Sequence, residues 1–256
     1  MIEEPYRWLE AIANRREYIE DQLRPASPVV AICGEPGILL LTKRATTPKL
    51  FEVYDQLALG CLGHPADMER VRQAAIETAH WEGFTRSRED VTARRIVSFS
   101  LAPALKNSFE QIFSAPLLFR GILVELTERP GADTAWTMDY DGSFVCWQGE
   151  NFFSGVLIAG RKEVVERWET EKEKSLASPL PGWKDLWERA WRLEAWACQA
   201  ATEREEAWQS WQLGEGRRLE EVISPGDYEL LLLTRSELSR ASSVCKPGAE
   251  EFLALL

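Results

Sequence analysis

The sequence predicts an α+β fold in which two largely antiparallel sheets lie face to face and pairs of helices cover their outer sides, a four-layer α/β/β/α sandwich. Two observations lead to this prediction. Runs of strand-like segments alternate with pairs of helical segments, whereas a doubly wound fold interleaves single strands with single helices. The turns between neighbouring strand-like segments are short and contain Gly, Pro or Asp, as hairpin turns do.

Composition limits the classes of function. The 256 residues suffice for one large domain or two small ones, and 45% apolar with 28% charged residues is an ordinary globular balance. The formal net charge of −11 argues against a basic surface that binds nucleic acid or an anionic membrane. Residues 1–23 carry charge throughout, so we expect neither a signal peptide nor a membrane span.

The reactive side chains follow no cofactor or metal motif. Five cysteines, an odd number, are scattered along the chain, which favours reduced thiols in a cytoplasmic protein over a disulfide framework or a zinc site. The sequence has two histidines and lacks a P-loop, a dinucleotide fingerprint and an HExxH motif. We therefore expect no cofactor and no metal.

The first half of the chain begins with a predicted amphipathic helix over residues 3–23, within an N-terminal helical segment 1–24. Its apolar residues recur at helical spacing: Trp8, Leu9, Ile12, Ile19 and Leu23. Four strands are predicted next, at Val29–Cys33, Ile38–Leu41, Leu50–Tyr54 and Leu57–Gly60. Two helices are expected after them, one from Pro65 to about Gly83 and one from an N-cap at Ser87 to about Phe113.

The second half repeats this alternation. Strands are predicted at 117–126, in a hairpin at 134–149, at 152–160 and at 228–235, and a short helix at 248–256. Residues 161–213 are predicted to be helical with a break at 178–182, and the tryptophans at 183, 187 and 191 mark a face buried on a neighbour. We treat residues 1–256 as one domain, with 214–256 as a C-terminal strand and helix extension.

One long stretch resembles a known family. The run "KLFEVYDQLALGCLGHPADMERVRQAAIETAHWEGFTRSREDVTARRI" is similar to subunits of the 20S proteasome, and most of all to the α-type subunits of actinobacteria. The matching positions are Lys49, Glu52, Tyr54, Asp55, Gly63, Gly83 and Arg88–Val91, followed by the turn Tyr140–Ser143 and the closing "YELLLLTR…FLALL". The resemblance implies the N-terminal-nucleophile hydrolase fold of proteasome subunits.

Ser27 decides between the two branches of that family. The β-type branch implies a hydroxyl nucleophile directly before the first strand, a free α-amine as base, and an aspartate after the second strand. Ser27 falls near the nucleophile position, but Thr42 stands where the aspartate belongs, and the preceding 26 residues resemble the retained helix of α-type chains. We therefore predict that Ser27 is not catalytic. The alternative is a self-processing N-terminal-nucleophile hydrolase that uses Ser27.

Lys49 has two interpretations. It is either a surface lysine at a strand edge or, as the resemblance implies, the lysine that binds the C-terminal carboxylate of a ring-shaped AAA ATPase or another activator between subunits. The segment "TKRATTPK" before it is shorter than in actinobacterial chains.

The resemblance implies a non-catalytic α-type subunit of a bacterial 20S proteasome core. Seven copies would form an outer ring that restricts the entry of unfolded protein substrate and stacks on β-type subunits, which carry the protease sites. Trp8, Leu9, Ile12 and Ile19 would take part in assembly. A further alternative is a stand-alone ring scaffold without a protease partner.

Overall fold

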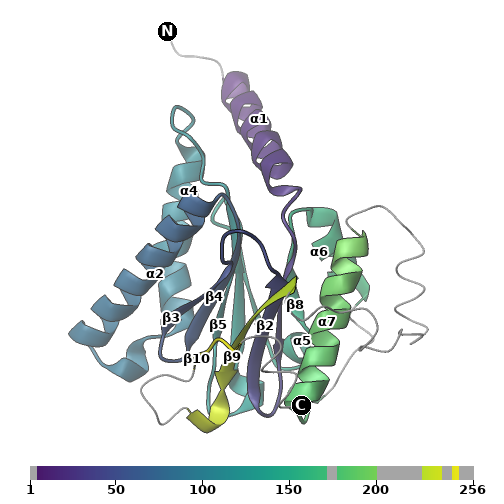
Figure 1. Cartoon of the computed structure of the whole chain (residues 1–256). Helices are drawn as coiled ribbons and strands as arrows, with labels where there is room; N and C mark the ends of the chain where they lie inside the picture. The colour runs from purple at the N-terminus through teal and green to yellow at the C-terminus, as the bar shows by residue number, and fades with distance from the viewer. Residues whose placement is uncertain (1–4, 172–177, 201–226, 238–243, 248–256) are drawn as a thin grey trace.

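A computed structural model describes residues 5–171, 178–200, 227–237 and 244–247 (Figure 1). Within these residues the chain forms helices and two antiparallel sheets, each containing five strands. The prediction of an α+β protein with two antiparallel sheets is confirmed. None of the described helices combines the length and the hydrophobicity that a membrane-spanning segment requires.

The first sheet joins both ends of the chain. Its strand order is β10-β9-β2-β1-β8, and every neighbouring pair is antiparallel. Strand β2 lies between β1 and β9, and its pairing with β9 runs without a break from Gly37 opposite Thr234 to Lys43 opposite Tyr228. The bounds are β1 Val29–Cys33, β2 Gly37–Lys43, β8 Val156–Ile158, β9 Tyr228–Thr234 and β10 Val244–Cys245.

The second sheet is a meander in chain order, β3-β4-β5-β6-β7. Its strands are β3 Leu50–Tyr54, β4 Leu57–Gly63, β5 Phe119–Glu125, β6 Thr134–Met138 and β7 Phe144–Gln148. The predicted hairpin is present, with the turn at 139–143 between β6 and β7. Strand β7 is one of the two edge strands of this sheet, as β8 is of the first.

Side chains alternate between two sides of each sheet. On β1, Val29, Ala31 and Cys33 face a core shared by both sheets, whereas Val30 and Ile32 belong to a second cluster with helices. The shared core also contains residues of β2, β4, β5 and β9. A Cβ added to Gly60 of β4 would lie 2.8 Å from Val29 Cγ1 of the other sheet, so any larger residue here would have to displace the Val29 side chain.

The remaining clusters lie under the helices. Helices α2 (Pro65–Thr85), α3 (Ala93–Ile96) and α4 (Ala102–Glu110) cover the outer side of the second sheet, while α7 (Trp183–Ala200) and residues of α6 (Lys162–Glu171) cover that of the first (Figure 1). Trp187 is buried in this last cluster, with Trp183 and Trp191 packed against it. The tryptophan stripe therefore contributes to a helix–sheet contact, as predicted.

Helix α1 (Pro5–Leu23) projects from one end of this body (Figure 1). Its C-terminal part packs on the shared core through Ile19 and Leu23, both buried. The predicted limits 3–23 are close to the observed ones.

Two predicted elements are wrong in detail. The second helix of the first pair begins at Ala93 with Thr92 as N-cap, because the Ser87 hydroxyl donates to Asp90 instead and residues 88–90 form a separate 3-10 turn. A π-helical turn at Val97–Leu101 then precedes Pro103, which lacks the N–H that a regular helix requires. This helix ends at Glu110 and does not reach Phe113.

The strand predicted at 152–160 is reduced to β8, because residues Glu150–Phe153 form the short helix α5. Gly149 and Gly155, both with positive φ, bracket that helix, and Phe152 and Phe153 enter the shared core. Strand β10 was not predicted. The helical segment predicted for residues 201–213 and the helix predicted for 248–256 lie outside the described residues, as does most of the 214–256 extension.

Candidate functional site

The structure brings Ser27, Thr42 and Lys49 together at one end of the sheets. Ser27 precedes β1, Thr42 lies near the end of β2, and Lys49 directly precedes β3. The Lys49 ammonium donates hydrogen bonds to the Ser27 carbonyl, with Nζ and O 3.1 Å apart, and to the Ser27 hydroxyl. Thr42 Oγ1 donates to the carbonyl of Pro28 at 2.7 Å. The strands thus bring together the three positions that the resemblance in the sequence pointed to.

These contacts lack two groups that N-terminal-nucleophile chemistry needs. The nitrogen of Ser27 is an amide within a chain that runs from α1 into β1, and an amide cannot serve as the base. The position of the aspartate is occupied by Thr42, which has no carboxylate. Its side chain is buried, and its hydroxyl donates to a carbonyl. In the form of the chain that the structure describes, Ser27 is a partner of Lys49 and lacks an activating amine.

Lys49 is 7% exposed, so it is not the surface lysine of the first interpretation. Burial lowers the pKa of its ammonium, while the negative charge of Glu229 acts in the opposite direction. Glu229 comes from β9, and its carboxylate accepts the backbone N–H groups of Lys49 and Leu50 at 2.9 and 3.2 Å. Lys246 binds the same carboxylate, with Nζ 2.6 Å from Oε1.

A second buried carboxylate, Glu194 of α7, belongs to the same end of the molecule. Burial raises its pKa, and its Oε1 accepts a hydrogen bond from the Cys198 thiol at 3.0 Å. Burial and the charge of Glu194 raise the pKa of Cys198 to about 12. Sequence reasoning missed both Glu194 and Glu229. The available signal was a glutamate within an apolar strand, "YELLLL", and another on the buried stripe of α7 that contains Leu193 and Ala197.

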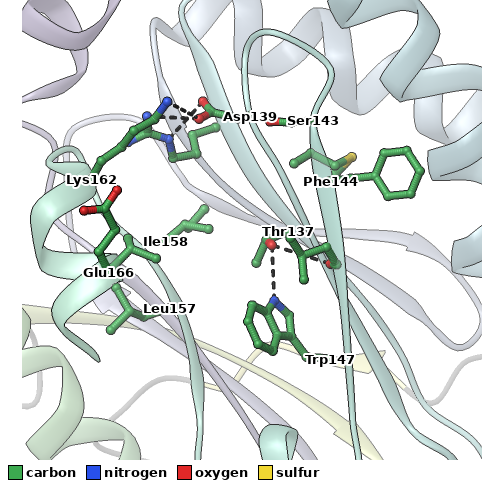
Figure 2. Close-up of a pocket in the computed structure, with 13 residues that line it drawn as sticks. Thr137, Asp139, Ser143, Phe144, Trp147, Leu157, Ile158, Lys162 and Glu166 are labelled. Carbon is green, nitrogen blue, oxygen red and sulfur yellow. Dashed lines mark hydrogen bonds and ion pairs between the residues drawn. The ribbon is translucent and has the colours of Figure 1, made fainter. Parts of the chain in front are cut away.

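A pocket of about 220 Å³ opens between the edges of the two sheets, near β7 and β8. Figure 2 shows Leu157 and Ile158 on one side, with Glu166 of α6, and Phe144 on the other. The Trp147 indole donates to Thr137 Oγ1 at 3.2 Å across its floor. The walls are predominantly apolar.

One end of this pocket is closed by an ion-pair network. The guanidinium of Arg120 on β5 lies 3.1 Å from carboxylate oxygens of Glu20 on α1 and of Asp139 after β6. The ammonium of Lys162 on α6 lies 3.0 Å from each of the same two residues, and its pairing with Asp139 is visible in Figure 2. Tyr140 donates to Glu20 at 2.7 Å. The network joins four parts of the chain, and its sequence signal was an arginine inside the buried strand "FRGILVE".

The residues predicted for assembly divide into two groups. Trp8 and Leu9, on the projecting part of α1, are 50% and 64% exposed. Ile12 is partly buried against the shared core, and Ile19 is fully buried in it. The structure thus separates Ile19 from the exposed apolar surface of the helix, so its side chain anchors α1 to its own chain.

Among the described residues, no group of three or more His, Cys, Asp or Glu side chains is arranged to hold a metal ion. The fully buried cysteine at the opposite end of β1, Cys33, donates to Asp133 at 3.1 Å, and Asp133 pairs with Arg235 at 2.7 Å. This second cluster ties the end of β9 to the loop before β6.

No protein-family model matches the chain. Curated proteins named "Proteasome subunit alpha" from actinobacteria do match it. The chain is 27% identical to the one from Xylanimonas cellulosilytica over 160 residues, which is 60% of this chain and 64% of that protein. It is 25% identical to the one from Streptomyces scabiei over 176 residues, covering 67% and 68% of the two chains.

A third relative of the same name, from Jonesia denitrificans, is 29% identical over 175 residues, which cover 66% of this chain and 71% of that protein. The similarity noted from the sequence is therefore found again in several actinobacterial proteins of one name. In the first of these relatives the matched segment spans less than two thirds of the protein's length.

Proposed function

We propose that this chain is the non-catalytic α-type subunit of a bacterial 20S proteasome core. The observation that carries the proposal is its similarity to actinobacterial proteins named "Proteasome subunit alpha". The two face-to-face antiparallel sheets with helices on their outer sides support it, because they agree with the four-layer sandwich of the N-terminal-nucleophile hydrolase type. A Ser27 nitrogen that is acylated within the chain between α1 and β1 agrees with a subunit that performs no proteolysis.

In this proposal seven copies form an outer ring in the cytoplasm. The ring restricts the entry of unfolded protein and stacks on β-type subunits, which carry the threonine-protease sites. The exposed side chains of Trp8 and Leu9, with the exposed part of Ile12, take part in assembly, and Ile19 fixes the helix that carries them. Large apolar side chains left in water cost roughly 25 cal/mol for each Å² of their surface, which favours their burial against another subunit.

Lys49 is proposed to receive the C-terminal carboxylate of a ring-shaped ATPase or another activator. Two further cations at the same end of the sheets support this role, Lys246, which pairs with Glu229, and Arg44, which contacts the Tyr228 carbonyl. A carboxylate that loses water in such a place needs a fixed positive partner.

The test is co-assembly. The chain would be expressed alone and together with a β-type subunit encoded in the same genome, and each preparation examined by native mass spectrometry. We expect a seven-membered ring or a stacked complex that cleaves fluorogenic peptides only when the β-type chain is present. A monomer in both preparations would refute the proposal, and a ring without affinity for any β-type chain would favour the scaffold alternative.

The contact between Lys49 and the Ser27 hydroxyl is the observation that favours the hydrolase alternative. Self-processing would release residues 1–26 and create a free amine at Ser27. Intact mass spectrometry after incubation with an epoxyketone inhibitor, which needs both a hydroxyl and a free amine, distinguishes the two functions. We expect an unprocessed, unmodified chain, and a shortened chain with an adduct at Ser27 would establish the alternative.

A further inference from the structure

The apolar stripe of α1 extends beyond the part of the protein on which the helix packs. Its members recur at helical spacing: Trp8, Ile12, Ile19 and Leu23. Ile19 and Leu23 are buried in the shared core and Ile12 packs against it, whereas Trp8 is 50% exposed on the projecting part of the helix (Figure 1). Trp8 therefore faces the same side as the anchoring residues but lies beyond the core, and an exposed indole in this position favours contact with another surface.

The pocket between β7 and β8 has the size and the lining to receive such a side chain. Its volume is about 220 Å³, and an apolar cavity of about 150 Å³ is large enough to bind benzene. Figure 2 shows Phe144 on one side and Leu157 and Ile158 on the other. Val145, which also lines the pocket, is 48% exposed. The pocket can therefore enclose one indole ring between apolar walls.

Glu166 gives this pocket a free hydrogen-bond acceptor. Its side chain lines the pocket from α6 (Figure 2), and within the described part of the chain its carboxylate has neither an ion-pair nor a hydrogen-bond partner. Other polar side chains of the lining are engaged, as in the bonds from Trp147 to Thr137 and from Lys162 to Asp139. A tryptophan indole has one donor, its Nε1–H, which usually needs an acceptor when the ring is buried. The pocket thus offers apolar walls for the ring and one acceptor for its N–H.

Trp8 cannot enter the pocket of its own chain. Glu20, on the same helix, belongs to the ion-pair network that closes one end of the pocket. Trp8 and Glu20 are about 18 Å apart along the axis of this continuous helix. A helix of this length does not fold back on itself, so a Trp8 side chain that fills the pocket comes from another copy of the chain.

A ring of identical chains requires two different surfaces that fit one another. In a closed cyclic assembly each copy presents one surface to one neighbour and another surface to the other neighbour. The exposed Trp8 and the pocket are a protrusion and a cavity of this kind on one chain. At a net charge of −11 the copies repel one another. A contact made of apolar groups and one hydrogen bond therefore suits them better than one between like charges.

We propose that the pocket between β7 and β8 receives the indole of Trp8 from the adjacent copy, with the Glu166 carboxylate as acceptor for its N–H. One tryptophan buries about 150–250 Å², a fraction of the roughly 800 Å² that each partner buries in a typical stable interface. The contact therefore fixes how neighbouring copies are placed within a larger interface. The number of copies and their role in a proteasome rest on the proposed function, whereas the fit of Trp8 to the pocket does not.

Photocrosslinking maps this contact directly. Trp8→p-azidophenylalanine keeps an aromatic ring at the position, and illumination attaches that ring to the groups it touches. We expect a covalent pair of chains whose crosslinked peptide, identified by mass spectrometry, contains residues 143–147 or 157–166. The same azide in place of Phe84, an 88% exposed residue of α2, should attach to neither segment. A crosslink from position 8 to any other segment, or the absence of a crosslinked pair, overturns the proposal.

Substitutions in the pocket test the contact quantitatively. Glu166→Lys removes the acceptor and should raise, at least about fivefold, the concentration at which half of the chain is assembled in analytical ultracentrifugation. Glu163→Lys is the matched control, because this exposed residue of the same helix undergoes the same charge change but does not line the pocket. It should not weaken assembly. Equal assembly of the two variants would overturn the proposal.

Val145→Arg blocks the pocket from the β7 side. It places a guanidinium where the indole would enter, and it should weaken assembly by a similar factor. Circular dichroism checks that the variant is folded. If it does not fold, the comparison of Glu166→Lys with Glu163→Lys decides, since both residues are exposed on a helix. A folded Val145→Arg that assembles like wild type would exclude the pocket as the receiving surface.

The outcomes separate this contact from the proposed function. If native mass spectrometry shows a seven-membered ring that binds a β-type chain while position 8 crosslinks elsewhere, the pocket contact is refuted and the proposed function stands. If position 8 crosslinks to the pocket but the assembly has another number of copies and no β-type chain joins it, the contact stands and the proposed function fails.

Discussion

Glu20 and Arg120 are 100 positions apart in the sequence, and their carboxylate and guanidinium lie 3.1 Å apart inside the protein. The Arg120 side chain is only 5% exposed, so its charge has little contact with water. Asp139 and Lys162 complete a set of two cations and two anions around this pair. Because Glu20 is on α1, the network fixes the projecting helix to the second sheet and to α6.

Removing the Arg120 charge should be costly. Arg120→Met leaves Glu20 and Asp139 without their buried partner, and breaking a buried pair in this way typically costs about 3–5 kcal/mol of unfolding free energy. Urea denaturation followed by circular dichroism would measure the loss. Arg24→Met is the matched control, because Arg24 pairs with Asp21 at 3.2 Å with both side chains more than half exposed, and it should change stability by less than about 0.5 kcal/mol. Similar losses in both variants would contradict the network's role.

The same network should make stability depend on pH. Burial acts to raise the pKa of Glu20, but the charge of Arg120 and the bonds from Tyr140 and Lys162 outweigh it and leave this pKa below its ordinary value. The unfolded chain therefore binds a proton at Glu20 more readily than the folded chain does. The stabilisation is fully present above the ordinary glutamate pKa of about 4.3 and is lost as the pH falls through the lower folded value.

Glu20→Gln should remove this part of the acid dependence. Denaturation midpoints measured from pH 7 down to about pH 3 should differ most between wild type and variant at neutral pH, and the difference should shrink as the pH falls. Asp21→Asn, which changes an exposed carboxylate on the same helix, should leave the shape of the wild-type curve intact. Parallel curves for wild type and Glu20→Gln would show that Glu20 is not the responsible group.

The exposed apolar side chains of α1 should be required for assembly. Trp8→Asp combined with Leu9→Asp places two charges on the projecting part of the helix while the anchor at Ile19 and Glu20 remains. We expect the chain to stay folded by circular dichroism and to fail to form the proposed ring in multi-angle light scattering. Phe84→Asp, at an 88% exposed position of α2, is the control for a charge placed elsewhere and should leave self-assembly of the chain alone unchanged. An unchanged mass for the α1 variant would count against this surface.

Lys49 should matter for an activator and Lys43 should not. Lys49→Ala removes an ammonium that is held in place by Ser27, and a partly buried charged bond of this kind contributes on the order of 1–3 kcal/mol. Binding of an ATPase C-terminal peptide should weaken by about tenfold or more, since 1.4 kcal/mol corresponds to a factor of ten. Fluorescence anisotropy with wild-type, Lys49→Ala and Lys43→Ala rings would measure it. If only Lys43→Ala lost binding, Lys43 would be the lysine of the pocket and the prediction for Lys49 would be wrong.

Periodic and hairpin features of the fold were predictable from the sequence. The strand Val29–Cys33 was placed at its observed limits, because five consecutive apolar residues between Pro28 and a turn leave little choice. The short helix α5 was not predictable, because Phe152 and Phe153 suit a strand by propensity. The positive φ values of Gly149 and Gly155 bend the chain on either side of them, so that both side chains point into the core. Propensity describes single residues, whereas tertiary packing decided this segment.

The candidate site was predictable only in part. Lys49 and Ser27 were selected by their positions along the chain, but their contact depends on how β1 and β3 meet across two sheets. Glu229 lies 180 positions from Lys49, and no local pattern connects them. A charged residue within an apolar strand is the signal that sequence reasoning can use, since such a residue must find a partner inside the protein. Which partner it finds is set by strand order.

The pairing of β2 with β9 has a consequence for how the protein is made. During synthesis β1 and β2 leave the ribosome long before Tyr228–Thr234, so the β2 edge "GILLLTK" has no permanent neighbour while both helical layers are still being produced. An apolar, unpaired edge of this kind is a template for association between nascent chains. The step that protects it joins remote segments and is expected to be slow. For this chain, chaperone demand should therefore depend on the interval before β9 emerges, and slowing translation just ahead of Tyr228 should lower the soluble yield.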